Sequence, residues 1–405
     1  MVFLTFMEDT MSKYSAIIIF LAIATLLTGQ VKYSDSLLRT AQNGDPEAQF
    51  QIGVCFQDGL GVKANKAEAV AWYSKASAKG HPGAQHNLAY CYYVGDGVAV
   101  DKKEAIRLYR LAANQGLSAA QYSLGLAYYS GDGLNHNPGE AVKWFQLAAD
   151  KGHANALYSL GLCYFNGDGV RKDKAEAIKW FEKSANAGSI MAMNNLAWCY
   201  KNGEGVPADP GSVLKWYRKA ADKNDPVAQY NLALAHFNGE GTPKNTPEAI
   251  KYLTRSAENN YAPAQYILGL SYYGGDGVAK SLPEAIKWYQ RAANGGHDTA
   301  QLTLGRMYFD GEGVTKDYAE AAKWYLKAAD NGNVTAMYNI GNCYAFGEGV
   351  QENAYEAFFW YSLAASSGDE DAIRARDILS RQFSKQDLNN LLKRAELWFY
   401  KHYSD

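Results

Sequence analysis

The sequence predicts an all-α protein, built as a solenoid of nine repeats with a capping helix or helices at each end. The first observation is a glycine-rich turn of the form Gly-acid-Gly-Val that recurs every 36 residues without an insertion. The second is a helical spacing of apolar residues on both sides of each turn. Because single repeats of this length cannot bury their apolar faces alone, they stack into a continuous core. The turns begin at Gly59 (where the acid is replaced by Leu60), Gly95, Gly131, Gly167, Gly203, Gly239, Gly275, Gly311 and Gly347.

Residues 80–115 illustrate one repeat, which we interpret as two helices joined by the turn. Apolar residues from Ala84 to Tyr92 follow the i, i+4, i+7, i+8 pattern of one helix face. Gly95 ends this helix, because glycine reaches positive φ without a Cβ clash. A second helix follows and ends at Gly116. We expect the glycines to reverse the chain and the acid between them to face water.

The second helix of every repeat carries a start signal. Asp101 is followed three residues later by Glu104, the spacing of a capping box. Equivalent positions hold Asn65, Asn137, Asp173, Asp209, Asn245, Ser281, Asp317 and Asn353, all good N-cap types. Only the fifth repeat lacks the acid, because Ser212 replaces it.

The two ends of the chain depart from the repeat and give the predicted domain limits. Residues 30–44 match the second helix of a missing repeat, and residues 45–368 hold the nine repeats. Residues 369–405 begin another first helix but never reach a glycine turn. Because terminal repeats cover the exposed core with a polar outer face, we expect this tail to form capping helices.

Residues 1–29 are expected to be an export signal. Lys13 precedes an apolar run from Ala16 to Leu27, the pattern of a secretory signal peptide. The run is shorter than the ~20 residues that a membrane span needs. An uncleaved anchor and a buried helix remain alternatives, since residues 27–29 make a poor cleavage site. The chain is therefore expected outside the cytoplasm, periplasmic or secreted, with membrane contact only through residues 1–29 if they are retained.

Composition argues against a nucleic-acid partner. The net charge is −2 and the pI is about 6.4, so no basic face for nucleic acid is expected.

The cysteines share one repeat position, where adjacent copies would lie too far apart for a disulfide. We interpret them as small buried residues. They are Cys55, Cys91, Cys163, Cys199 and Cys343.

Catalytic and metal motifs are weak, and we expect neither a cofactor nor a metal. Ser212 and Lys215 fit the S-x-x-K pair of β-lactamases, but no S-D-N or K-T-G partner accompanies them. His81, His153 and His297 share one position at the entrance of a first helix, where they are expected to be turn or cap residues. The turn acids lack the alternating oxygen ligands of a calcium loop.

The repeat as a whole resembles the Sel1-like repeat, a relative of the tetratricopeptide repeat. The pattern includes Ala84-Gln85, Leu88-Ala89, Gly95-Asp96-Gly97-Val98, Glu104-Ala105 and Ala112-Ala113. The resemblance covers residues 45–368 and implies a right-handed α/α superhelix that serves as a protein-binding scaffold. In bacteria such proteins are often exported and act in the envelope, in signalling or in contact with host cells. A cysteine-rich subgroup is associated with β-lactamase activity and penicillin binding, but it carries a cysteine pair in each repeat, whereas this chain has at most one.

By analogy with tetratricopeptide proteins, first helices line a concave groove that binds a peptide or protein segment. Amide side chains there offer a donor and an acceptor to an extended main chain, and tyrosines are enriched at recognition surfaces. The same rings could instead pack only against neighbouring helices. The candidate residues are His86, Asn87, Tyr122, Tyr158, Asn195, Tyr230, Asn231, Tyr266, Tyr338 and Asn339. A further aromatic row follows at Tyr93, Tyr129, Phe165, Phe237, Tyr273 and Phe309.

The sequence therefore predicts a non-enzymatic scaffold that binds a protein or peptide partner in this groove. The competing hypothesis is a β-lactamase or penicillin-binding activity that uses Ser212 and Lys215. A third hypothesis is a structural spacer whose concave face is no more selective than its convex face.

Overall fold

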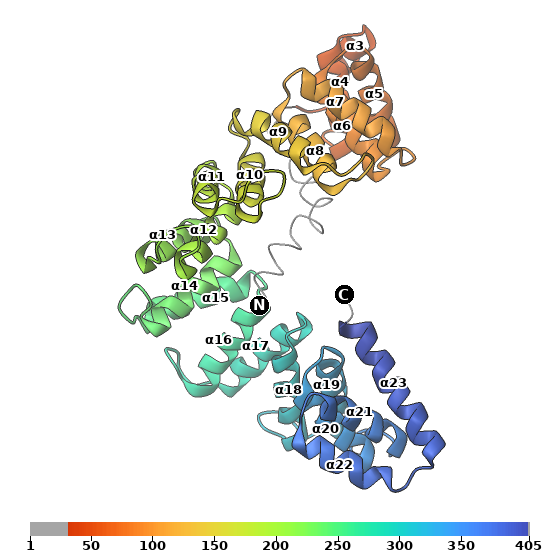
Figure 1. Cartoon of the computed structure of the whole chain (residues 1–405), viewed down its shortest axis with the longest axis vertical. Coiled ribbons are helices and arrows are strands. Elements are labelled where there is room, and N and C mark those ends of the chain that lie inside the picture. Colours follow the sequence, from red (N-terminus) through yellow and green to blue (C-terminus); the bar gives the residue numbers. More distant parts are fainter. Residues whose placement is uncertain (1–30, 404–405) are drawn as a thin grey trace. The chain divides into compact units, whose positions relative to one another are not determined.

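The computed structural model describes residues 31–403, and within that range every regular element is a helix. Figure 1 shows the helices following one another along the chain as pairs joined by short turns. The chain divides into two compact units between Trp216 and Tyr217. The sequence did not predict this division, because the repeat continues through it without an insertion. The predicted export signal lies outside the described residues.

From residue 31 onward, the N-terminal unit contains the single helix α3 (Asp35–Gln42), followed by pairs of a first and a second helix. The pairs are α4 (Pro46–Asp58) with α5 (Lys66–Ala78), α6 (Pro82–Val94) with α7 (Lys102–Asn114), α8 (Ser118–Ser130) with α9 (Pro138–Ala149), and α10 (Ala154–Asn166) with α11 (Lys174–Asn186). The first helix α12 (Ile190–Asn202) follows, and α13 (Pro210–Asp222) contains the division.

The C-terminal unit contains four further pairs and two final helices. The pairs are α14 (Pro226–Asn238) with α15 (Thr246–Glu258), α16 (Ala262–Gly274) with α17 (Leu282–Asn294), α18 (Asp298–Asp310) with α19 (Tyr318–Asp330), and α20 (Val334–Phe346) with α21 (Ala354–Ser366). The final helices are α22 (Glu370–Ser380) and α23 (Lys385–Tyr403). The predicted all-α repeat solenoid is confirmed.

The glycine turn has two different tasks. Gly95 ends α6 at φ 80°, and its N–H donates to the carbonyl of Cys91, as expected for a left-handed helix end. Gly97 also has positive φ, and a Cβ added there would lie 2.5 Å from the carbonyl oxygen of Lys66 in the preceding repeat. The first glycine reverses the chain, and the second lets adjacent repeats touch.

The predicted N-caps of the second helices are confirmed, but the capping box is only half formed. Asp101 Oδ1 accepts the N–H of Glu104 at 3.0 Å. The N–H of Asp101 donates to the carbonyl of Tyr92 on the first helix, so the Glu104 side chain does not bind it. Glu104 instead forms an ion pair with Arg107 at 2.6 Å. The glutamate therefore supports the helix through an i, i+3 pair of modest energy.

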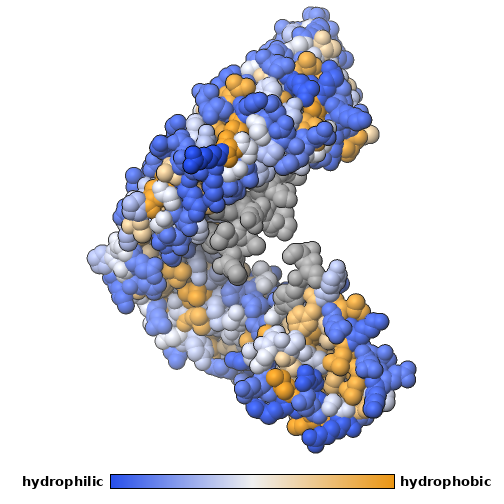
Figure 2. Space-filling model, in the orientation of Figure 1, coloured by the Kyte–Doolittle hydropathy of each residue, from blue (hydrophilic) through white to orange (hydrophobic). Residues whose placement is uncertain are grey.

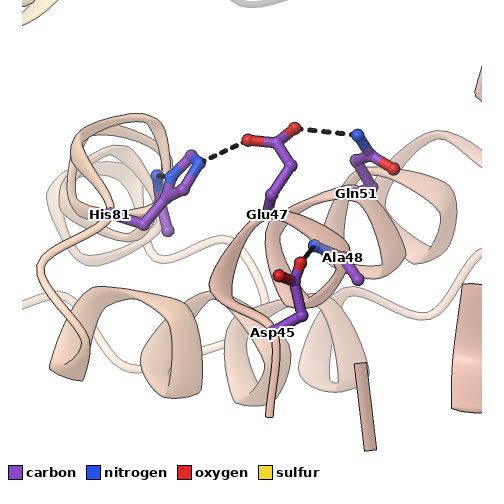
Figure 3. A network of polar contacts seen from close by, with 6 residues as sticks. Asp45, Glu47, Ala48, Gln51 and His81 are labelled. Carbon is purple, nitrogen blue, oxygen red and sulfur yellow. Dashed lines mark hydrogen bonds and ion pairs between the residues drawn. The ribbon is translucent and has the colours of Figure 1, made fainter. Parts of the chain in front are cut away.

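Most first helices are capped by the side chain of the residue before them, and histidine performs this task as predicted. The exceptions are α8 and α16, where Leu117 and Tyr261 make no side-chain cap. In Figure 3, Asp45 caps α4 by accepting the N–H of Ala48 at 2.7 Å, and His81 reaches Glu47 of the preceding repeat. His81 Nδ1 accepts the N–H of Ala84 at 3.0 Å. The proton therefore lies on Nε2, which donates to Glu47 at 2.9 Å. His81 joins two repeats while it starts a helix.

The core lies between the two helices of each repeat and continues from one repeat to the next. All five cysteines are buried and free, as predicted for small packing residues. A glycine inside the first helix faces an aromatic ring of the second: a Cβ added to Gly125 would lie 2.6 Å from the ring of Phe145. Buried glutamines accompany this packing, and Gln265 Nε2 donates to the carbonyl of Ala257 at the end of the preceding helix. This role of the glutamines was not predicted from the sequence.

Two helices, α22 and α23, lie in the C-terminal tail, where capping helices are predicted, and part of their surface is apolar. Leu391 and Ala395 of α23 are buried, and Arg394 forms an ion pair with Glu356 of α21 at 2.7 Å. Ile378 and Leu392, in contrast, are 63% and 42% exposed. The tail covers α21 and leaves apolar surface elsewhere.

We predict that Gly125→Ala destabilises the protein by roughly 1–3 kcal/mol, because the added methyl group overpacks the contact with Phe145. Ala89 faces Tyr109 at the same position of another repeat, so the helices can move apart and the fold should persist. Urea unfolding followed by circular dichroism measures the cost. The pair Ala233 and Leu253 occupies these positions in the sixth repeat, so Phe145→Leu should reduce the cost of Gly125→Ala. Equal costs in both backgrounds would contradict the prediction.

Candidate binding face

The candidate binding surface is a stripe along the first helices, which we name the first-helix face. On α16 it consists of Tyr266, Leu270 and Tyr273, at i, i+4 and i+7, so these residues lie on one side of the helix. The same positions in the other repeats contain all of the predicted tyrosines. Each predicted asparagine is the residue after the first position of the stripe.

In the N-terminal unit most of the predicted residues are buried and bound to the next repeat. His86, Asn87, Tyr122 and Tyr158 are buried. His86 Nε2 lies 3.3 Å from Ser123 Oγ, and Asn195 Nδ2 donates to Tyr158 Oη at 2.9 Å. Burial raises the pKa of Tyr158. These contacts show that the row links neighbouring repeats in this unit, the packing role that the sequence left open.

In the C-terminal unit the predicted residues keep part of their surface exposed. Tyr266 stacks on His297 at 4.7 Å between ring centroids, and Tyr230 meets Tyr261 edge-on at 5.4 Å. One side of each ring therefore packs against the entrance of the next first helix. The half-buried members of the predicted set here are Tyr230, Asn231, Tyr266, Tyr338 and Asn339.

One row of the first-helix face, one turn beyond the tyrosines, was not predicted from the sequence. Leu270 is 38% exposed and Arg306 is exposed, whereas Leu126 and Leu162 at the same position are buried in the N-terminal unit. The i, i+4 spacing from Tyr266 to Leu270 was the signal that could have found it. In the repeats from α12 onward this row contains Trp198, Leu234, Leu270, Arg306 and Asn342.

The expectation that the turn acids simply face water is wrong for several of them. Asp132 accepts a hydrogen bond from Tyr93 at 2.6 Å and pairs with Lys102 at 2.6 Å, both from the preceding repeat. Burial raises the pKa of Asp132, but the hydrogen bonds from Lys102 and Tyr93 outweigh burial and the pKa is lowered. The acid therefore holds two repeats together. Comparable contacts join Tyr129 to Asp168, Lys66 to Asp96, Lys174 to Glu204 and Tyr273 to Glu312.

Two histidines are held neutral by burial. The pKa of His86 and that of His153 are each lowered to about 4. His153 Nδ1 accepts the N–H of Ala156 at 3.3 Å, and its ring packs against Tyr122 at 4.9 Å. A neutral ring is required for this cap, because a protonated Nδ1 cannot accept a hydrogen bond.

The described geometry gives no chemical support to the Ser212 and Lys215 pair. The N–H of Ser212 donates to Asp209 Oδ2 at 3.1 Å, as in a helix start, and Lys215 Nζ lies 5.2 Å from the centroid of the Trp216 ring. Among residues 31–403 no three acidic, histidine or cysteine side chains gather as a metal site would require. Over the same range no helix is both long and apolar enough to cross a membrane.

A comparison with known protein families identifies the repeat. The Sel1 repeat model matches nine consecutive segments between residues 46 and 369: 46–81, 82–117, 118–153, 154–189, 190–225, 226–261, 262–297, 299–333 and 334–369. The chain belongs to the Sel1 repeat family. Sel1 repeat proteins are generally protein-interaction scaffolds.

Two solved structures are similar to this Sel1 repeat protein over most of its length. A Sel1 repeat protein from Oxalobacter formigenes is 28% identical, with a TM-score of 0.62, over 89% of this chain and 93% of that one. The protein c5321, a protective antigen present in uropathogenic Escherichia coli strains, is 26% identical, with a TM-score of 0.60, over 91% of this chain and 94% of that one. A bacterial origin fits both neighbours.

Two curated relatives match only a short part of this chain. DAP3-binding cell death enhancer 1 from Rattus norvegicus is 47% identical over 38 residues, and the Mus musculus protein is 44% identical over 48 residues. These segments cover 9% and 12% of the Sel1 repeat chain. The chain spans less than a tenth of the length of these relatives, at 8% and 9%.

We predict that His153→Asn reduces the loss of stability in mild acid. The folded chain keeps His153 neutral down to about pH 4, whereas an unfolded chain protonates it below about pH 6.5. Stability therefore falls as the pH drops through this window, by ~3 kcal/mol from this residue. Asn333 caps α20 at the equivalent position, so the variant keeps a cap that does not titrate.

Urea unfolding of wild type and variant at about pH 7 and about pH 4.5 measures the difference. Ser189→Asn is the matched control, since it exchanges one non-titrating cap for another at the start of α12, and it should lose as much stability as wild type. If His153→Asn also loses as much, the histidine has no such role.

Proposed function

We propose that this Sel1 repeat protein is a non-enzymatic scaffold that binds an extended protein segment along the first-helix face of its C-terminal unit. The observation that carries the proposal is the half-buried tyrosine and asparagine pair, present as Tyr230 with Asn231 and as Tyr338 with Asn339. The same pair stands at the same position of α14 and α20. Repetition of one amide at one helix position suits a ligand that itself repeats, such as a main chain.

The chemistry of the face supports a peptide over a small molecule. An asparagine amide can donate to a carbonyl and accept from an N–H of the same extended segment. Tyr230, Tyr266 and Tyr338 are each packed on one side by a neighbouring ring, so little conformational entropy is lost when a ligand contacts the other side. Leu270 adds apolar area next to Tyr266.

The amide contacts are tested by the double variant Asn231→Ala, Asn339→Ala. Peptides of about twelve residues, long enough when extended to cross more than one first helix, are selected from a displayed library against the wild-type protein. Their affinities are then measured by fluorescence anisotropy. Each lost hydrogen bond is worth roughly 0.5–1.5 kcal/mol, so the double variant should bind roughly tenfold more weakly.

The matched control is Asn294→Ala, which removes an exposed amide at the end of the second helix α17. It should bind the selected peptides as wild type does. Unchanged binding by a folded Asn231→Ala, Asn339→Ala variant would show that the amides of the first-helix face do not contact the ligand. A selection that yields no peptide with measurable affinity counts against the scaffold itself.

We further propose that the protein acts outside the cytoplasm, in the envelope or in contact with host cells. The apolar run from Ala16 to Leu27 after Lys13 supports export. The similar protein c5321 is a protective antigen, which fits an exposed location for a relative of this chain. Partners would then be proteins of the envelope or of a host surface.

We predict that the mature protein from fractionated bacterial cells lacks residues before about position 30, because a signal peptide is removed on export. Intact-mass spectrometry of the periplasmic and secreted fractions measures the N-terminus directly. Deleting residues 1–29 should retain the protein in the cytoplasm. Recovery of wild type only from the cytoplasm, with an intact N-terminus, would contradict export.

A further inference from the structure

The C-terminal cap contains a cleft that the repeat pattern does not account for. It has a volume of about 550 Å³ and lies between α21, α22 and α23. Its wall contains Ser362 and Ser366 from α21 and Arg376 from α22. The remainder comes from α23, as Leu392, Ala395, Glu396, Phe399 and Tyr400.

The cleft exists because α22 has no partner helix of its own. α22 begins as a first helix does, with Asp369 accepting the N–H of Ala372. In the complete repeats of the described chain other than the fifth, the first helix makes its most extensive contact with the second helix that follows it. Here α22 and α23 both pack on α21 and at most touch one another. No Gly-acid-Gly turn follows α22, so α23 does not return to cover it.

Apolar side chains line this cleft and extend beyond it. Leu392, Glu396 and Phe399 follow one another at i, i+4 and i+7 along α23, on the side that faces the cleft. Leu392 is 42% exposed and Tyr400 is 74% exposed. Figure 2 shows apolar atoms gathered over this C-terminal part of the molecule, at the lower right. Contiguous exposed apolar surface is a feature of interaction sites.

The charges in the cleft make it complementary to itself. Arg376 lies on the α22 wall and Glu396 on the α23 wall. The ion pair that the structure gives to Arg376 is with its sequence neighbour Asp377 at 2.8 Å, near the surface. A two-fold axis through the cleft would bring Arg376 of one copy to Glu396 of the other, twice. In a two-fold symmetric dimer, both copies use the same surface patch.

We propose that the C-terminal cleft is a homodimer interface, in which α23 of each copy fills the cleft of the other. Tyr400 and Leu392 supply the apolar contact, and the Arg376 to Glu396 pairs fix the two-fold register. In this dimer, α23 of the second copy lies next to α22, where the second helix would lie in a complete repeat. The interface is independent of the first-helix face, so a dimer would present two such faces.

The test uses the full chain and charge reversal. Sedimentation equilibrium measures the dimer dissociation constant for wild type, Arg376→Glu and Glu396→Arg. Each single variant places like charges together at both contacts, and we expect each to weaken the dimer by about tenfold or more. In an equimolar mixture of the two variants every contact pairs Glu with Arg, so a heterodimer should form with nearly wild-type affinity.

Recovery of dimer formation in the mixture would show that the two variants are folded and that only the contact was weakened. It also separates an intermolecular pair from one within a single copy, because mixing cannot repair the latter. Leu392→Glu should likewise abolish the dimer, whereas Phe346→Glu should not, although Phe346 of α20 is 72% exposed and lies outside the cleft. Circular dichroism checks that each variant is folded.

Three outcomes would overturn the proposal. If the wild-type chain stays monomeric at about 100 µM, which corresponds to weak association, the cleft does not bind a second copy. A mixture that fails to form the heterodimer removes the charge pairing. Binding of an amphipathic helical peptide to a monomeric wild type, lost in Leu392→Glu, would assign the cleft to a different protein.

Discussion

The close approach of each glycine turn to the preceding repeat is the constraint on which the stack depends. At Gly97 an added Cβ would reach within 2.5 Å of the Lys66 carbonyl oxygen, and at Gly205 within 2.5 Å of the Lys174 carbonyl oxygen. Both glycines also have positive φ, so a side chain would be strained in its backbone as well as crowded. This contact brings the turn against the start of the preceding second helix. The acid between the two glycines then lies within reach of the lysine there, and of the tyrosine that ends the preceding first helix.

The contacts between repeats follow from that approach. Asp132 binds Tyr93 and Lys102, and where the repeat supplies Phe165 in place of tyrosine, Lys174 lies over the ring and still pairs with Glu204. A phenylalanine removes the hydroxyl but preserves the lysine contact. Ion pairs at a surface contribute little by themselves. Their value here is geometric, because repeated nearest-neighbour contacts fix how one unit stacks on the next.

Much of this architecture could be predicted from the sequence, because the period and the helix starts are local signals. The caps from Asp101 to Asn353, the glycine helix ends and the cap roles of His81, His153 and His297 were confirmed for this reason. The contacts of Asp132 and the burial of His86 and Tyr158 could not be predicted in the same way. They depend on residues 30 to 39 positions away in an adjacent repeat, and one repeat read alone shows only a solvated acid and an exposed ring. The division inside α13 leaves no mark in the repeat spacing.

Comparison of equivalent positions within the chain separates stacking from recognition. Several positions that shape the repeat vary little: the turn glycines, the buried alanines and the N-caps recur with few changes. Position 90 and its equivalents behave differently, with leucine in four repeats and Trp198, Arg306 or Asn342 in others. Leu270 and Arg306 are exposed at this position. Trp198 packs against Phe165 of the preceding repeat, and Asn342 accepts a hydrogen bond from Tyr361. The position therefore serves packing in some repeats and reaches the surface in others. Under the proposed function, a ligand that crosses several repeats of the C-terminal unit would meet a row that changes from leucine to Arg306 and then to Asn342. Selectivity in such a scaffold would come from the order of its varied residues along the stack.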